Sequence, residues 1–184
     1  MKKFAKQLTG LFLALVMVLS MSVSVFAAPN HSIGEKGNTD CSVKVTLAYY
    51  DVTFTDTSIN KGAIHTDSVT VTVKDGTTVE EAVEKAMTSE DWLQIDSIVG
   101  KWVPVTDYYD STIIHDALNS VTIDNKEYAT VTRDTDTQWR GAGWTYTGTN
   151  GNTAFDTNKY MCDNVITENK STITLTYDTY EYNK

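Results

Sequence analysis

Histidine, cysteine and basic residues are all scarce in this sequence. Three histidines and two cysteines stand among 184 residues, and 15 lysines and arginines face 24 acidic residues. No histidine or cysteine pair has the close spacing of a zinc site, and no basic cluster is present to bind phosphate groups. These absences exclude the zinc-finger class and argue against nucleic acid or anionic lipid as a partner.

Known catalytic and metal-binding motifs are also absent from the sequence. Ser111, His115 and Asp110 come nearest to a catalytic triad, but no Gly-x-Ser-x-Gly motif surrounds the serine. Asp134 and Asp136 resemble the start of a calcium loop, whose glycine and closing glutamate are missing. We therefore expect a protein that is not an enzyme and that holds no metal or other cofactor.

Only one long apolar run is present, and it lies at the beginning of the chain. Basic residues precede Leu11 to Val25, and Ala27-Ala28 follows. This order predicts a secretory signal peptide over residues 1–27, with Val25 and Ala27 at the positions that signal peptidase reads. The alternative is an uncleaved membrane anchor, because the apolar run is nearly long enough to cross a bilayer.

Cleavage would leave 157 residues beginning at Ala28, with 12 basic and 24 acidic residues and a net charge near −12. This length suits one domain with its own core. We expect the domain to be secreted, either free or associated with the cell envelope, and not inserted into the membrane after cleavage.

The two cysteines, Cys41 and Cys162, are 121 positions apart. In an oxidising compartment, an even number of cysteines without metal-ligand spacing most simply forms a disulfide bond. A bridge that closes so long a loop would stabilise the domain by roughly 4 to 5 kcal/mol on the chain-entropy model. We predict a Cys41–Cys162 bridge, with two unbridged thiols as the alternative.

Apolar residues at every second position predict the first strands of the domain. Residues 28–40 are polar and predict a flexible leader, which contains His31. The alternating runs predict strands over residues 43–47 and 69–73, and His65 falls in what we interpret as a polar loop between them.

A helix is predicted directly after the turn dipeptide Asp75-Gly76. Thr77 and Glu80 have the spacing of a capping box, and an apolar stripe continues to Met87. Strand-like runs follow at residues 92–105, 128–132, 144–147 and 172–180. This element order predicts an α+β domain over residues 41–184, a β-grasp-like mixed sheet packed on one main helix from about Thr78 to Met87.

Aromatic residues gather around one predicted hairpin. Trp139, Trp144 and Tyr146 flank a glycine-containing stretch, and Asn150-Gly151 follows. Rings beside freely bending backbone make a platform for a flat or apolar ligand. The alternative for Trp144 is a place in the core, whereas Trp139 has polar neighbours and is expected to be exposed.

Three short stretches resemble a known family. Val71 to Ala82 resembles the strand, turn and helix that open the transcobalamin-like C-terminal domain, a β-grasp-like domain of unknown function in secreted and surface proteins of Gram-positive bacteria. Gly143 to Tyr146 with Asn150-Gly151 resembles the family's Gly-Trp-x-Tyr and Asn-Gly hairpin, and Met161 to Asn164 with Ile173 to Tyr177 resembles its closing segment. Relative to the family, the segment from about Tyr108 to Lys126 looks inserted, and its first part fits a short helix or an irregular segment equally.

The resemblance also implies where a ligand would bind. In transcobalamin and intrinsic factor, the similar domain covers one face of a bound corrinoid, which implies ligand-facing roles for Trp144, Tyr146, Asn150 and Gly151. The corrinoid itself does not follow, because those carriers enclose it with a separate helical domain that this sequence does not contain.

These observations predict a non-catalytic secreted or cell-surface binding module. Its small ligand, corrinoid-like among the candidates, or its glycan would bind at the aromatic hairpin that begins with Trp139. The alternative is a structural or adhesive domain of the cell envelope with a surface protein as its partner. A hydrolase that uses His115 is a third hypothesis.

Overall fold

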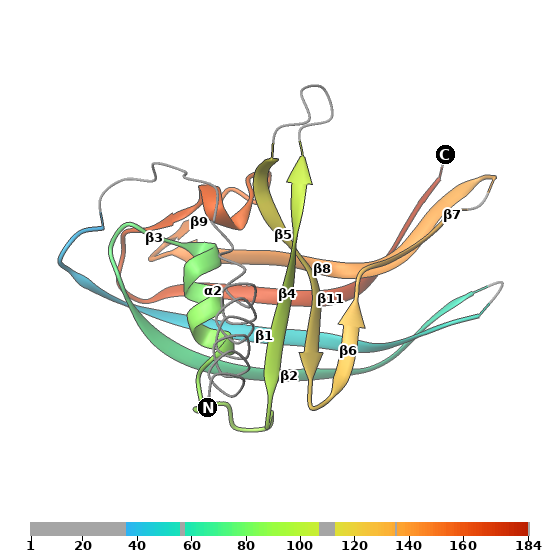
Figure 1. Cartoon of the computed structure of the whole chain (residues 1–184), viewed down its shortest axis with the longest axis horizontal. Helices are drawn as coiled ribbons and strands as arrows, with labels where there is room; N and C mark the ends of the chain where they lie inside the picture. Colours follow the sequence, from blue (N-terminus) through green and yellow to red (C-terminus); the bar gives the residue numbers. More distant parts are fainter. Residues whose placement is uncertain (1–35, 56–57, 107–112, 135, 184) are drawn as a thin grey trace, which may run out of the picture. The chain divides into compact units, whose positions relative to one another are not determined.

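The computed structural model describes residues 36–55, 58–106, 113–134 and 136–183, so the predicted signal peptide and most of the predicted leader lie outside the described residues (Figure 1). Strands dominate the described chain, and α2 is its only α-helix. The elements are β1 (Asp40–Phe54), β2 (Ile59–Lys74), β3 (Thr77–Thr78), α2 (Val79–Met87), β4 (Ile98–Thr106), β5 (Ile113–Ile123), β6 (Lys126–Ala129), β7 (Val131–Asp134), β8 (Gln138–Asn150), β9 (Thr153–Ala154), the 3₁₀ helix η1 (Met161–Asp163), β10 (Val165–Ile166) and β11 (Ser171–Asn183).

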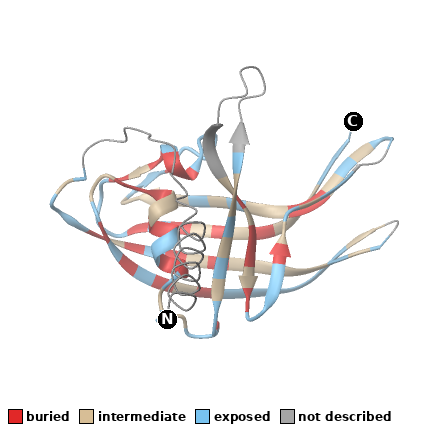
Figure 2. Cartoon of the chain, viewed as in Figure 1, coloured by how far each residue is buried: buried red, intermediate tan, exposed pale blue. Residues whose placement is uncertain are grey.

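A six-stranded sheet, called here the main sheet, has the strand order β2-β1-β11-β8-β7, with β9 paired to β8. The first and last strands, β1 and β11, are parallel neighbours, and the other pairs are antiparallel. Val43, Val45 and Leu47 are buried on one face of β1, as their alternation predicts. Figure 2 shows the same alternation of buried residues along the neighbouring strands.

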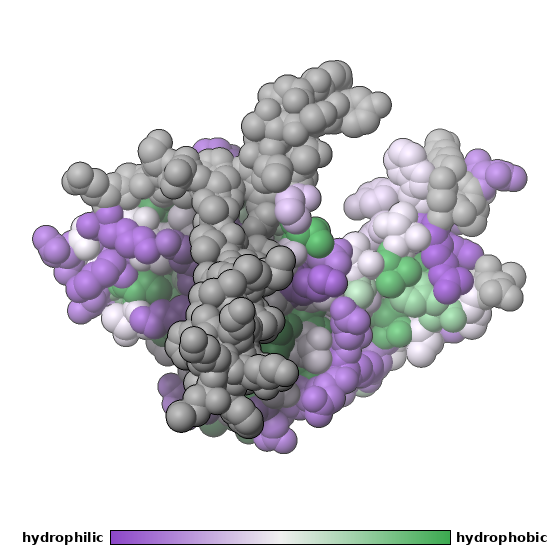
Figure 3. All heavy atoms as spheres, viewed as in Figure 1, coloured by the Kyte–Doolittle hydropathy of each residue, from purple (hydrophilic) through white to green (hydrophobic). Residues whose placement is uncertain are grey.

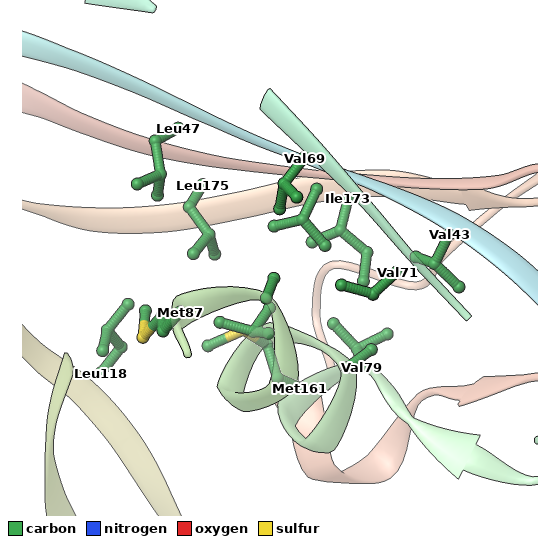
Figure 4. Packing of buried hydrophobic residues seen from close by; sticks show 14 of the residues in the cluster. Val43, Leu47, Val69, Val71, Val79, Met87, Leu118, Met161, Ile173 and Leu175 are labelled. Atoms are coloured by element: carbon green, nitrogen blue, oxygen red, sulfur yellow. The ribbon is translucent and has the colours of Figure 1, made fainter. Parts of the chain in front are cut away.

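A second layer covers one face of the main sheet, called here the inner face. It consists of α2 and of the antiparallel sheet β4-β5-β6, whose strands cross those of the main sheet (Figure 1). Strand β3, which directly precedes α2, pairs with β10 in a short two-stranded sheet. Side chains from both layers and from η1 meet in one core, which Figure 4 shows through Leu47, Val69, Ile173 and Leu175 of the main sheet, Met87 and Leu118 of the second layer, and Met161 of η1.

The predicted helix forms, with its capping box one residue later than expected. The Thr78 hydroxyl accepts a hydrogen bond from the Glu81 backbone N–H, and the Glu81 carboxylate accepts one from the Thr78 N–H, both at 3.1 Å. The apolar stripe of α2 is buried against the main sheet. Helix α2 is only one part of the second layer.

The prediction of an α+β, β-grasp-like sheet packed on one main helix is therefore wrong. The chain is mostly β, with several sheets, because the segment interpreted as an insertion from Tyr108 to Lys126 contains β5. This strand pairs with β4 on one side and with β6 on the other. A second sheet, rather than the helix alone, covers the main sheet.

The predicted disulfide bond between Cys41 and Cys162 is not present in the structure. Both side chains are buried, Cys41 on the inner face of β1 and Cys162 in η1. Burial, with the nearby carboxylates of Asp75 and Glu168, raises the pKa of the Cys41 thiol, so this sulfur is held in its neutral form. The terminal strands lie side by side through backbone pairing, without a bridge.

Candidate functional site

A row of aromatic rings crosses the inner face of the main sheet. Trp144, Tyr177, Tyr49 and His65 occupy partnered positions in β8, β11, β1 and β2. The Trp144 and Tyr177 ring centroids are 5.3 Å apart, and the Tyr49 and His65 rings stack at 5.1 Å. Tyr128 of β6 packs edge-on against both Tyr49, at 4.9 Å, and Tyr177, at 5.5 Å. These five residues are called here the aromatic row.

The inner face becomes polar where the aromatic row ends. In β2 the buried residues Val69, Val71 and Val73 are preceded at the same spacing by His65 and Asp67. Strand alternation therefore places a carboxylate and an imidazole on the face that carries the core elsewhere. A pocket of about 410 Å³ lies here, walled by β1, β2 and the β5–β6 turn. Figure 3 shows hydrophilic residues gathered over β6, which borders this pocket.

Asp51 forms two ion pairs in this pocket, which is called here the inner pocket. It lies beside an irregularity in the β1–β2 pairing between Tyr50 and Val52, and strand alternation places it on the same face as Tyr49, two positions earlier. Its carboxylate lies 2.9 Å from His65 Nε2 and 2.5 Å from Lys126 Nζ. Hydrogen bonds from His65 and then Lys126 lower the pKa of Asp51, and the bond to Asp51 raises the pKa of Lys126.

Two further carboxylates hold the walls of the pocket in place. Asp67 is only 7 % exposed and accepts backbone hydrogen bonds from Ser68, at 2.7 Å, and Gln94, at 2.8 Å. Asp124 occupies a left-handed position in the β5–β6 turn, with φ of 49°, and accepts the backbone N–H groups of residues 96 and 97. Asp67 thereby holds residue 94 against β2, and Asp124 holds the β5–β6 turn against residues 96 and 97.

Tyr49 also lines the pocket. Burial raises the pKa of its hydroxyl, and the nearby Tyr128, Asp124, Asp67 and Asp51 raise it further. The hydroxyl is therefore neutral at ordinary pH and can donate or accept a hydrogen bond. Three carboxylates, one ammonium group and one imidazole line a pocket whose walls are partly aromatic. Such a site can bind a small polar molecule by stacking and hydrogen bonds.

Trp144 and Tyr146, two of the predicted ligand-facing residues, make structural contacts. Trp144 is half-buried, and its Nε1 donates a 2.7 Å hydrogen bond to the Tyr128 carbonyl oxygen. The Tyr146 hydroxyl donates to the Lys159 carbonyl oxygen and accepts from the Asn164 side chain, both at 2.6 Å. Trp144 thus forms the β8 end of the aromatic row and packs, partly buried, against the core.

Asn150 and Gly151 shape the turn after β8. The Asn150 side-chain oxygen accepts the backbone N–H groups of Thr167 and Glu168, both at 2.9 Å. Gly151 has φ of 59°, a conformation that favours glycine. Trp139 lies five positions before Trp144, on the opposite face of β8, and is 53 % exposed as predicted. The structure therefore does not bring the five predicted residues together in one pocket.

The pocket residues were missed because the sequence around them looks like a loop. His65, interpreted as part of a polar loop, lies in β2, and Lys126 ends the segment interpreted as an insertion. The available signal was the spacing of His65 and Asp67, which continues the alternation of the three valines that follow. Polar residues on an otherwise apolar stripe indicate a site on the buried face.

The remaining predicted chemistry receives no support from the described residues. Ser111 and Asp110 lie outside them, as do the side chains of His115 and Asp134. Within the described ranges, no group of three or more histidine, cysteine or acidic residues is arranged to hold a metal ion. The same ranges contain no helix with the length and apolar content needed to cross a membrane.

No protein-family model matches this chain, and no curated protein matches it. The resemblance to the transcobalamin-like domain therefore rests on the three short stretches alone.

Proposed function

We propose that this protein is a non-catalytic, secreted or cell-surface binding module whose small ligand enters the inner pocket. The observation that carries the proposal is the passage of the aromatic row into a polar pocket on the buried face of the main sheet. Stacked rings offer contact area at a small entropic cost, and the carboxylates and Tyr49 hydroxyl offer directed hydrogen bonds.

The charge of the pocket selects the ligand class. Asp51, Asp67 and Asp124 outnumber Lys126 and His65, so an anionic ligand would meet net repulsion. A neutral polyol such as a sugar unit, or a cation, suits the site better. A volume of about 410 Å³ is in the range of pockets for small molecules, which favours such a ligand over a whole corrinoid.

Titration of the purified protein with monosaccharides and small amines, followed by tryptophan fluorescence, tests this proposal. Trp144 contacts the aromatic row and provides a reporter. Asp51→Asn should weaken the response of any ligand that binds, whereas Trp139→Ala, on the outer face, should leave it unchanged. The opposite pattern would place the ligand at the exposed end of β8 and contradict the pocket assignment.

A structural or adhesive role with a protein partner remains the second candidate, and one observation favours it. Trp139 and Tyr182 are register partners in β8 and β11 and are 53 % and 62 % exposed. Large exposed rings at the end of a strand pair are frequent in protein contacts. Retention of the purified protein on cell-envelope fragments should then fall in Trp139→Ser and persist in Asp51→Asn.

A further inference from the structure

The inner pocket already binds one ammonium group, that of Lys126. Its Nζ lies 2.5 Å from Asp51 Oδ1 and 4.8 Å from the centroid of the Tyr128 ring. A carboxylate and the face of an aromatic ring are the two groups with which proteins recognise organic cations. The pocket therefore contains a carboxylate and an aromatic ring placed so that both contact one ammonium group.

The position that Lys126 fills is open to solvent. Its side chain is 57 % exposed and that of Asp51 is 39 % exposed, so the ion pair is screened by solvent. The lysine stem has four rotatable bonds and can turn toward water without moving the β5–β6 backbone. A competing cation would retain the contacts with Asp51 and Tyr128 that Lys126 releases.

The surroundings add further attraction for positive charge. Asp67 and Asp124 also line the pocket, and both are fixed by backbone N–H groups rather than by cations. The Tyr49 ring stacks on His65 and presents its hydroxyl close to these carboxylates. A ligand cation would thus meet two rings and three carboxylates, whereas an anion would be repelled.

We propose that the ligand of the inner pocket carries an ammonium group, and that this group takes the position that Lys126 Nζ now fills. This inference rests on the proposed function, because it names the ligand class of the same site. Removing the positive charge of Lys126 from the pocket wall should therefore strengthen binding.

Isothermal titration with choline and with its uncharged isostere 3,3-dimethylbutan-1-ol tests the inference at low salt. Choline should bind and the isostere should not. Lys126→Met removes the internal competitor and should tighten choline binding by about threefold, the scale of an exposed ion pair. Asp51→Asn should weaken it by about tenfold, because the quaternary ammonium of choline loses its opposing carboxylate charge in the pocket. Lys74→Met is the matched control, because Lys74 pairs with Asp40 outside the pocket and its loss changes the net charge equally.

The outcomes separate this inference from the proposed function. Unchanged or weaker choline binding in Lys126→Met, or equal tightening in Lys74→Met, would overturn the ammonium assignment. Binding of N-acetylglucosamine or of the isostere without binding of choline would also overturn it and leave the pocket function intact. No response to any of these probes would contradict both. In the wild-type protein, choline should also shift the ring-proton signals of His65, which checks the site if a variant folds poorly.

Discussion

Replacing Trp144 with phenylalanine tests whether this residue supports the aromatic row or faces a ligand. The change keeps a ring on the inner face and removes the 2.7 Å hydrogen bond from Nε1 to the Tyr128 carbonyl. That bond contributes about 1 kcal/mol, and the smaller ring buries less apolar area, worth roughly another 1 kcal/mol. We therefore expect the free energy of unfolding to fall by about 2 kcal/mol, or the Tm by about 4 to 8 °C.

Urea unfolding followed by circular dichroism measures this loss. The matched control is Trp139→Phe, because Trp139 belongs to the same strand and is 53 % exposed. We expect the control to change the free energy of unfolding by less than about 0.5 kcal/mol. Equal effects of the two substitutions would refute the supporting role of Trp144, and full stability with lost ligand binding would return it to the ligand-facing class.

Two further predictions concern the strand pairing and the pocket. A Cβ at Gly141 would collide with the Val131 carbonyl and the Tyr180 hydroxyl, so Gly141→Ala should lower the free energy of unfolding by about 1 to 3 kcal/mol in a thermal melt. Gly143→Ala is the control and should be tolerated in the same melt, because the nearest atoms to its Cβ would be 3.5 Å away. The lowered pKa of Asp51 means that the unfolded chain binds more protons near pH 4, so its contribution to stability is present above that pH and is lost as the pH falls through the folded pKa. Asp51→Asn should therefore be less stable at pH 7, by under about 1 kcal/mol because the group is partly exposed, and should lose less stability on acidification; a wild-type acid profile parallel to that of the variant would contradict the assignment.

The sequence predicts those parts of the fold whose signals are local. Val43, Val45 and Leu47 alternate with polar residues, and β1 buries them. The helix forms where a capping threonine precedes an apolar stripe.

The second sheet is not predictable in the same way, because its alternation is interrupted. In β5 the register with β4 skips Asn119, so that Leu118 faces Trp102 while Ser120 faces Lys101. Leu118, Ser120 and Val121 are all buried, which breaks the period of two that identifies a strand. A strand with such an irregularity is specified by its pairing partners rather than by an alternation of its own.

The pocket is also hard to predict from local patterns, because His65 and Asp67 stand where the apolar alternation of β2 would otherwise continue. Valines at positions 65 and 67 would continue the apolar stripe of β2 and would bury more surface than His65 and Asp67 do. Asp67 needs two backbone N–H groups to be tolerated at 7 % exposure, and Asp51 lies beside an irregularity in the β1–β2 pairing. These residues interrupt the apolar stripe of β2 and lie beside an irregularity in the β1–β2 hydrogen bonding, and they add no apolar side chain to the core. All of them line the inner pocket. Departures from the folding pattern are expected at functional sites, and their convergence on one place is the reason that the pocket, rather than the aromatic hairpin, carries the proposed function.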